Sequence, residues 1–339
     1  MELKSCLAAL MPYIAMILVE CFDVGLTTIS KAAMSNGLSH FIFVVYSNAL
    51  AAALLLPPAF IFNRKTGPPL TLSLLCKFFL LSLIGITIMQ NCVFTGINYS
   101  SPTLGSAMSN LVPVFTFLLA VTFRLEKIDL RSLRSQIKIL GTLVSISGAL
   151  VVTFYEGPAI LSVSSHISDS NVLATETNWV LGGLFLATAS FCLSVWNASQ
   201  AAILKGYPSG MTIVAFYCLF GAIQCSIVSL IAERNNPSAW KLSGEIEYIS
   251  VIYSAVFGGV VTYCIMTWCI YKKGPIFVAS FKPVSIAIAA IFSYVFLGES
   301  LYLGSVIGAI FIVIGFYGVM WAGTTNEDNK KKEPYMFLK

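Results

Sequence analysis

The chain has 339 residues, of which 57% are apolar and only 10% are charged, and its formal net charge is +5. Soluble domains average about 25% charged residues, so this composition excludes an ordinary soluble globule and indicates an integral membrane protein. The basic residues are scattered over several short loops. They form no continuous patch, and no nucleic-acid partner is expected.

Apolar stretches recur along the whole chain, each close to the roughly 20 residues that a helix needs to cross a bilayer. They predict ten transmembrane helices at residues 11–33, 41–62, 74–96, 103–123, 137–155, 178–203, 211–232, 249–270, 276–297 and 301–322. These spans leave no room for a separate soluble domain. We therefore predict an all-α, multi-pass integral membrane protein.

The distribution of Lys and Arg predicts the orientation of these helices. With both termini in the cytoplasm, 16 of the 20 basic residues fall on the inner side. Lys31, Arg234 and Lys241 fall on the outer side, and Lys282 lies within a span. The opposite orientation would invert this bias, so both termini are expected to be cytoplasmic.

Landmarks in the first half of the chain recur in the second half at a constant offset of 173 residues, which carries 85–130 onto 258–303 without a gap. The matching pairs are Gly85 with Gly258, Pro102 with Pro275, and Glu126 with Glu299. Five spans in each half reverse the direction of the second half, so the repeats are expected to have inverted topology, as in many carriers.

The predicted domains follow from this repeat. Residues 1–155 form the first five-helix repeat, 156–177 an outer linker, 178–323 the second five-helix repeat, and 324–339 a cytoplasmic tail that we expect to be disordered. Glu126 and Glu299 end apolar helices near the interface, and we interpret them as helix-capping residues, not as substrate ligands.

Small residues recur at helical spacing in the fifth and tenth spans, a pattern that lets two helix backbones approach closely. They are Gly141, Ser145 and Gly148 in the fifth span and Gly304, Gly308, Gly315 and Gly318 in the tenth. Two explanations stay open. The glycines pack against neighbouring helices of the same chain, or they form the seam of a homodimer.

The first span carries two carboxylates, Glu20 and Asp23, on one helical stripe with Tyr13, Thr27 and Lys31. Ionisable groups inside a span cost about 2.5–3.5 kcal/mol each and usually face a protein interior or a cavity. The stripe would therefore bind a cation, an amine or a coupling proton. The alternative is a hydrogen-bonded pair that only fixes helix packing.

Lys282 is the ionisable residue of the ninth span, next to Pro283, which interrupts the backbone hydrogen bonds. Lys282 would receive a substrate carboxylate or pair with Glu20 or Asp23. The alternative is that its side chain reaches back to the inner interface.

Other polar and aromatic residues inside the spans would together complete a site for a small amphipathic organic ion, although each alone is better explained by packing or an interhelical hydrogen bond. These candidates are Asn48, Gln90, Asn91, Asn110, Trp196, Asn197, Tyr217, Gln224, Tyr263 and Trp268.

Enzymatic function is not expected, because the sequence has no nucleophile elbow and no HExxH motif. Its two histidines, His40 and His166, fall in predicted loops, and no cofactor or metal site is expected. A channel is less favoured because no selectivity-filter sequence is present, and ten spans do not match a seven-helix receptor.

Several segments, in order along nearly the whole chain, resemble the plant nodulin-like, Walls-Are-Thin-related transporters, which are EamA-type members of the drug/metabolite transporter superfamily. They include Pro12–Met16, Ser30–Ala33, Ser100–Leu104, Arg124–Glu126, Gly148–Leu150, Lys273–Ala279, Leu297–Ser300 and Gly304–Gly308. The resemblance implies ten helices, two EamA repeats, cytoplasmic termini and transport of amino acids, auxin-like compounds or related solutes. A neutral residue, often Gln, is common in that family where this chain has Glu20.

Together these observations predict a secondary carrier for amino acids or similar small organic solutes, working by alternating access around a central cavity between the repeats. A carrier of auxin or another organic anion is the alternative. Glu20 and Asp23 would bind the amine or a coupling proton, and Lys282 the carboxylate. The expected location is the plasma membrane, with the vacuolar membrane as the alternative.

Overall fold

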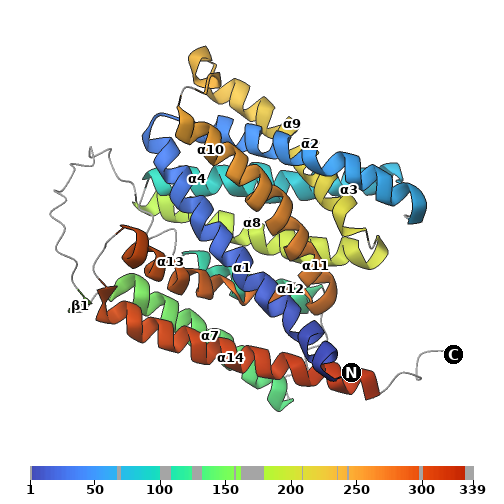
Figure 1. Ribbon diagram of the computed structural model, residues 1–339, viewed down its shortest axis with the longest axis vertical. Coiled ribbons are helices and arrows are strands. Elements are labelled where there is room, and N and C mark those ends of the chain that lie inside the picture. Colours follow the sequence, from blue (N-terminus) through green and yellow to red (C-terminus); the bar gives the residue numbers. More distant parts are fainter. Residues whose placement is uncertain are drawn as a thin grey trace. The chain divides into compact units, whose positions relative to one another are not determined.

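The computed structural model describes residues 2–66, 70–99, 108–123, 132–155, 158–161, 179–207, 209–234, 236–242, 244–297 and 301–332, and nearly all of them are helical (Figure 1). By length and composition, six helical stretches of this described part are able to cross a membrane: Leu10–Met34, His40–Ile61, Leu72–Gly96, Val180–Gly206, Gly210–Ala232 and Glu245–Lys273. The predicted helical membrane class is confirmed. The count of ten spans stays a prediction.

The helices form two compact units, and each draws on both halves of the sequence. Unit 1 contains residues 1–125 and 173–279, and unit 2 contains residues 126–172 and 280–339. The helices of unit 1 are α1 (Glu2–Ser35), α2 (His40–Thr66), α3 (Leu72–Ser82), η1 (Leu83–Ile88), α4 (Met89–Tyr99), α6 (Leu111–Thr122), α8 (Trp179–Gly206), α9 (Gly210–Ala232), η2 (Pro237–Trp240), α10 (Glu245–Tyr253), η3 (Ser254–Thr262), α11 (Tyr263–Lys273) and α12 (Pro275–Ala279).

Two long helices of unit 1 are interrupted by π-helical turns at matching places. The segment η1 joins α3 to α4, and η3 joins α10 to α11. The offset of 173 residues carries Leu83–Ile88 onto 256–261, which lies inside η3. Wide turns of this kind are rare and occur often at functional sites. Their matching positions support the repeat that the landmarks predict.

Helices α2 and α9 pack side by side in opposite directions in unit 1 (Figure 1). Ser39, just before α2, contacts Glu233, just after α9, and Phe60 near the end of α2 contacts Phe216 near the start of α9, with ring centroids 6.3 Å apart. Both helices are largely buried in the unit, and Ile42 of α2 and Ile213 of α9 are fully buried. This pair forms one wall of the unit.

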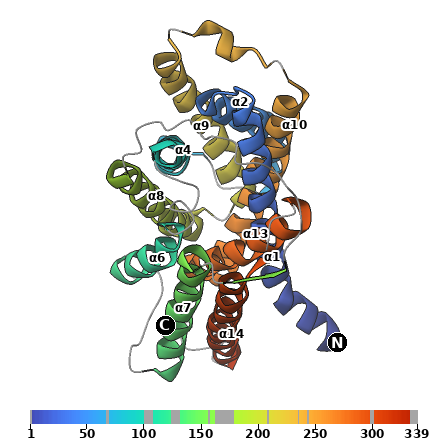
Figure 2. The same ribbon diagram turned by 90° about the vertical axis from the view of Figure 1, so that its left-hand side faces the viewer.

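Unit 2 is built on α7 (Leu133–Phe154) and α14 (Leu303–Lys332), which lie side by side in both views (Figures 1 and 2). A short helix, α13 (Lys282–Leu297), packs on both of them. The strands β1 (Ala159–Leu161) and β2 (Leu301–Tyr302) pair in antiparallel fashion, and the Leu303 amide donates to the Pro158 carbonyl at 3.0 Å.

Glycines allow α7 and α14 to come into backbone contact. A Cβ added to Gly141 would meet the Gly315 carbonyl oxygen at 2.6 Å, and one added to Gly148 would meet the Gly308 carbonyl oxygen at 2.7 Å. Between them, Ser145 donates its hydroxyl to the Ile312 carbonyl at 3.2 Å. The small residues of the fifth and tenth predicted spans therefore pack against one another within one chain. A homodimer that uses other surfaces stays a prediction.

The ninth predicted span, 276–297, is broken in the structure. Helix α12 ends at Ala279 and α13 begins at Lys282, with Pro283 in its first turn, where a missing amide hydrogen costs no helical bond. The predicted tail is helical at its start, because α14 continues to Lys332. The expectation of disorder from residue 324 is therefore wrong up to that residue.

Several predicted features lie outside the described residues. They are Pro102, Glu126, Glu299, most of the 156–177 linker and residues 333–339. The division into two five-helix repeats and a linker stays a prediction.

Candidate functional site

Three aromatic residues from three helices meet in unit 1. Trp196 on α8, Tyr217 on α9 and Tyr263 at the start of α11 have ring centroids 5.1 to 5.9 Å apart, and the two tyrosine rings are perpendicular. Edge-to-face contacts at this distance are favourable because a positive ring edge meets a negative ring face. Trp196 and Tyr217 are 1% exposed, so the cluster belongs to the core.

Gly85 in η1 lies directly against the Trp196 and Tyr217 side chains of this aromatic cluster. A Cβ at this position would lie 2.6 Å from the Tyr217 hydroxyl oxygen and 2.9 Å from Cγ of Trp196. Only a glycine leaves room for both rings. The π-helical turn thus brings bare backbone against the cluster, which explains why a glycine serves better than any other residue there.

Two polar side chains accompany the aromatic cluster. Gln90 on α4 donates from Nε2 to the Tyr263 hydroxyl at 3.2 Å. The Asp23 carboxylate on α1 lies within electrostatic reach of the hydroxyls of Tyr263 and Tyr253. Residues of the first and second halves of the sequence therefore share one polar and aromatic centre.

A hydrogen-bond network joins η1 to α9 next to this cluster. The Thr87 hydroxyl donates to Oε1 of Gln224 at 2.8 Å, and Nε2 of Gln224 donates to the Phe79 carbonyl at 3.1 Å. The Ser82 hydroxyl donates to the Tyr217 carbonyl at 2.9 Å. These buried bonds fix the cluster on its helices, since a buried polar group that lost its partner would cost about 1–3 kcal/mol.

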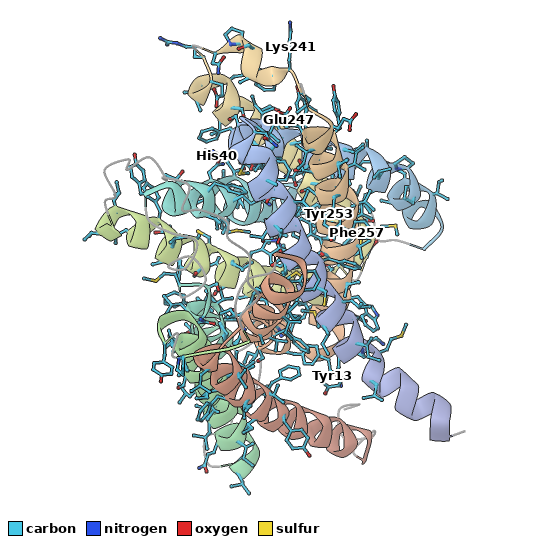
Figure 3. The ribbon with its side chains drawn as sticks, turned by 60° about the vertical axis from the view of Figure 1, so that its left-hand side comes forward. Tyr13, His40, Lys241, Glu247, Tyr253 and Phe257 are labelled. Carbon is cyan, nitrogen blue, oxygen red and sulfur yellow. The ribbon has the colours of Figure 1, made fainter. Side chains whose placement is uncertain are left out.

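Helix α1 brings Glu20 and Asp23 to different environments. Glu20 is fully buried, whereas Asp23 is half-buried. Beside them, the Phe22 ring lies 4.9 Å from that of Phe257, which in turn lies 4.7 Å from Tyr253 (Figure 3). Of the predicted stripe, Tyr13 and Glu20 are buried, Asp23 is half-buried and Thr27 is exposed, so the stripe faces the protein interior only in part. Its ligand stays a prediction.

Not every candidate residue joins the aromatic cluster. Asn48 and Asn91 donate to carbonyls of their own helices, Val44 at 2.8 Å and Thr87 at 2.6 Å. Asn110 and Asn197 are buried and Trp268 is half-buried, and their roles stay a prediction. The structure thus brings together Gln90, Trp196, Tyr217 and Tyr263, and Asp23 interacts electrostatically with Tyr263.

Lys282 begins α13 and is half-buried, and its carbonyl accepts a hydrogen bond from Ser285 at 2.7 Å. It belongs to unit 2, whereas Glu20 and Asp23 belong to unit 1. Its pairing with either carboxylate, or with a substrate, stays a prediction.

The structure adds residues that the sequence analysis did not select. Gln200 donates from Nε2 to the Thr267 hydroxyl, and both are 1% exposed. Tyr253 lies against Gly25, whose added Cβ would meet the tyrosine hydroxyl at 2.7 Å. A signal was present for Gln200, which lies one helical turn after Trp196 and therefore shares its face.

Buried polar atoms near the cluster have open hydrogen-bonding capacity. Among the described residues, Nε1 of Trp196 and Oε1 of Gln200 have no hydrogen-bond partner. The residues present thus combine a carboxylate, aromatic faces, an indole donor and an amide acceptor. A carboxylate beside aromatic faces attracts an ammonium group, and the remaining donors and acceptors suit a second polar group on the same solute. Among the described residues, no group of three His, Cys, Asp or Glu side chains is arranged to hold a metal ion.

Comparison with known proteins gives a consistent result. The profile of the EamA-like transporter family matches residues 11–154 and 180–321. The chain is 45% identical over 327 residues to the WAT1-related protein At3g28050 of Arabidopsis thaliana, covering 94% of this chain and 89% of that one. It is 44% identical over 328 residues to the WAT1-related protein At5g40240 of the same plant, covering 94% and 88%. A solved crystal structure at 14% identity has the same fold, with a TM-score of 0.67 over 94% of this chain and 99% of that chain.

Proposed function

The chain belongs to the EamA-like transporter family, so it is a multi-pass membrane transporter and not an enzyme, and we propose that it is a secondary carrier of amino acids or similar small organic solutes. The proposed mechanism is alternating access: the two sequence halves move against one another and open a central binding site first to one side and then to the other.

One observation carries this proposal: the contact between Gln90 and Tyr263. The two residues are 173 positions apart, so the repeat offset makes them equivalent. A residue touches its own counterpart only close to a two-fold axis. Their hydrogen bond therefore supports a pseudo-two-fold axis that passes through the aromatic cluster. In carriers built from inverted repeats the substrate site lies at this interface.

The contacts of α7 and α14 support the same symmetry within unit 2. An offset of 167 makes Gly141 equivalent to Gly308 and Gly148 equivalent to Gly315. The observed contacts are crossed, with Gly141 against Gly315 and Gly148 against Gly308. Crossed pairs of this kind are what a two-fold operation produces. We therefore infer ten helices in two inverted repeats of five.

Within this proposal, Asp23 receives the amine of the solute and the aromatic rings enclose its apolar part. Glu20 contributes to the same charge or carries a coupling proton, and the role expected for Lys282 stays a prediction. The carrier would reside in the plasma membrane with both termini in the cytoplasm, since this orientation places 16 of 20 basic residues inside.

The test is uptake into liposomes that contain the purified protein, with a panel of labelled amino acids and indole-type organic acids at two pH values. Saturable amino-acid uptake that Asp23→Asn abolishes is the expected result. Saturable uptake of the organic acids alone would support the auxin alternative instead. Flux that fails to saturate would indicate a channel, and it would overturn the carrier proposal.

A further inference from the structure

A short strap in unit 1 contacts α2 close to the start of that helix. It comprises residues 236–242, follows α9 and contains η2. Two local backbone hydrogen bonds fix its conformation. The Asn236 amide donates to the carbonyl of Glu233, just before the strap, at 3.0 Å, and the Lys241 amide donates to the Ser238 carbonyl at 3.0 Å. The strap lies at the same end of the unit as His40, whereas Tyr13 lies toward the other end (Figure 3). It is thus a defined element at one end of the unit.

Two side chains attach the α9–strap region to the first half of the chain. The Tyr46 hydroxyl on α2 donates to the Trp240 carbonyl at 2.8 Å, and their rings meet edge to face at 6.2 Å. The Ser39 hydroxyl donates to Oε1 of Glu233 at 2.5 Å, a bond strengthened by the negative charge of its acceptor. Both pairs are 194 residues apart, so both join the first half of the sequence to the second.

We propose that these two contacts form a latch, which closes the strap end of the transport route and breaks each time that end opens. The inference rests on the proposed alternating access, in which the first and second halves separate at one end. Two hydrogen bonds are a suitable latch, because each has a small net strength and both can form and break in a thermal cycle. When the latch closes again, the edge-to-face contact between the Tyr46 and Trp240 rings would return the strap to its original position on α2.

The chain offers a matched control for the Tyr46 contact. The Tyr248 hydroxyl on α10 also donates to a strap carbonyl, that of Leu242, at 3.1 Å. This bond joins residues only six positions apart, and both belong to the second half. Tyr248→Phe therefore removes an equivalent bond to the strap without loosening it from the first half.

Opening of the latch can be measured without knowledge of the solute. Cys21 and Cys264 are half-buried, next to Glu20 and Tyr263 in sequence. Peptide mass spectrometry would follow their labelling by a membrane-impermeant maleimide, added to intact expressing cells and, separately, to inverted membrane vesicles. Tyr46→Phe and Ser39→Ala should each raise the labelling rate about fivefold from the side that the strap faces, as loss of one hydrogen bond allows. Tyr248→Phe should leave it unchanged.

A second experiment holds the latch closed. A short bifunctional thiol reagent would join Ser39→Cys to Glu233→Cys, with each single variant treated in the same way. The crosslink should stop uptake of the amino-acid panel, and a reducing agent should restore it. The latch would be overturned if labelling stayed unchanged in Tyr46→Phe and Ser39→Ala, or if it rose as much in Tyr248→Phe as in those two variants. Full uptake by the crosslinked protein would also overturn it. If the wild type takes up no panel member, the proposed function fails while the labelling still decides whether the strap opens.

Discussion

Gln90 and Tyr263 occupy equivalent positions in the two halves of the chain, and they are hydrogen-bonded to each other, with 3.2 Å between Nε2 and the hydroxyl oxygen. Gln90 has an amide side chain and Tyr263 has a phenol, so the two halves place chemically different groups at the equivalent position. The centre of unit 1 is consequently asymmetric. A bound solute would meet an amide from one half and an aromatic ring from the other, which gives the site a fixed polarity.

We expect Tyr263→Phe to lower uptake at limiting solute concentration about fivefold, because the ring contacts remain but the hydrogen bond to Gln90 is lost. Initial rates in liposomes at equal protein content measure this. Tyr317→Phe removes a hydroxyl from an exposed position on α14 and should leave the rate unchanged. Equal rates for wild type and Tyr263→Phe would show that the Gln90 contact has no part in transport.

Asp23→Asn should reduce uptake of amine-bearing solutes at least tenfold, since the neutral amide no longer attracts an ammonium group beside the aromatic rings. Organic acids without an amine should be affected less. The matched control is Glu245→Gln, which neutralises an exposed carboxylate in the first turn of α10. An equal loss for both solute classes would mean that Asp23 supports the fold and not the selection of charge.

Gly148→Ala should destabilise the protein by about 1–3 kcal/mol, because the new Cβ would lie 2.7 Å from the Gly308 carbonyl oxygen and the α7 and α14 backbones would have to separate. A thiol-reactive dye that follows thermal unfolding in detergent would show a midpoint several degrees lower. Gly206→Ala is the matched change, since an added Cβ there meets nothing within 4 Å, and its midpoint should not fall.

Thr87→Val should cost about 1–3 kcal/mol of stability, because Oε1 of Gln224 loses its buried donor. Thr188→Val removes a hydroxyl that bonds only to the Leu184 carbonyl of its own exposed helix face, so its effect should be small. A double-mutant cycle with Gln224→Leu isolates the pair, and a coupling energy near zero would show that Thr87 and Gln224 act independently.

The helices of this protein could be predicted from hydropathy, because each apolar run must satisfy its backbone hydrogen bonds internally in the bilayer. The interruptions η1 and η3 could not, since a π-helical turn has the same composition as the helix around it. The break before Lys282 was signalled by Pro283, but its position at the boundary between the two units was not.

Part of the candidate site was predictable, because polar and aromatic residues inside apolar spans stand out in the sequence. Gln90, Trp196, Tyr217 and Tyr263 meet as the sequence suggested. Asn48 and Asn91 each donate from Nδ2 to a carbonyl one helical turn earlier in the chain. Residue spacing alone does not distinguish such a local bond from a long-range one. Gln200 was not selected, although it shares a helix face with Trp196, and the sequence gives no sign of its bond to Thr267 on α11.

The glycine contact between α7 and α14 also sets an order of assembly during synthesis. Helix α7 is complete at Phe154, but the partner for Gly141 and Gly148 is made only when Gly308 and Gly315 leave the ribosome. During that interval the second part of unit 1 is synthesised. Unit 2 is therefore the last part of the protein that can close, and a chain that stops before residue 303 would leave the small-residue face of α7 available to helices of other proteins in the same membrane.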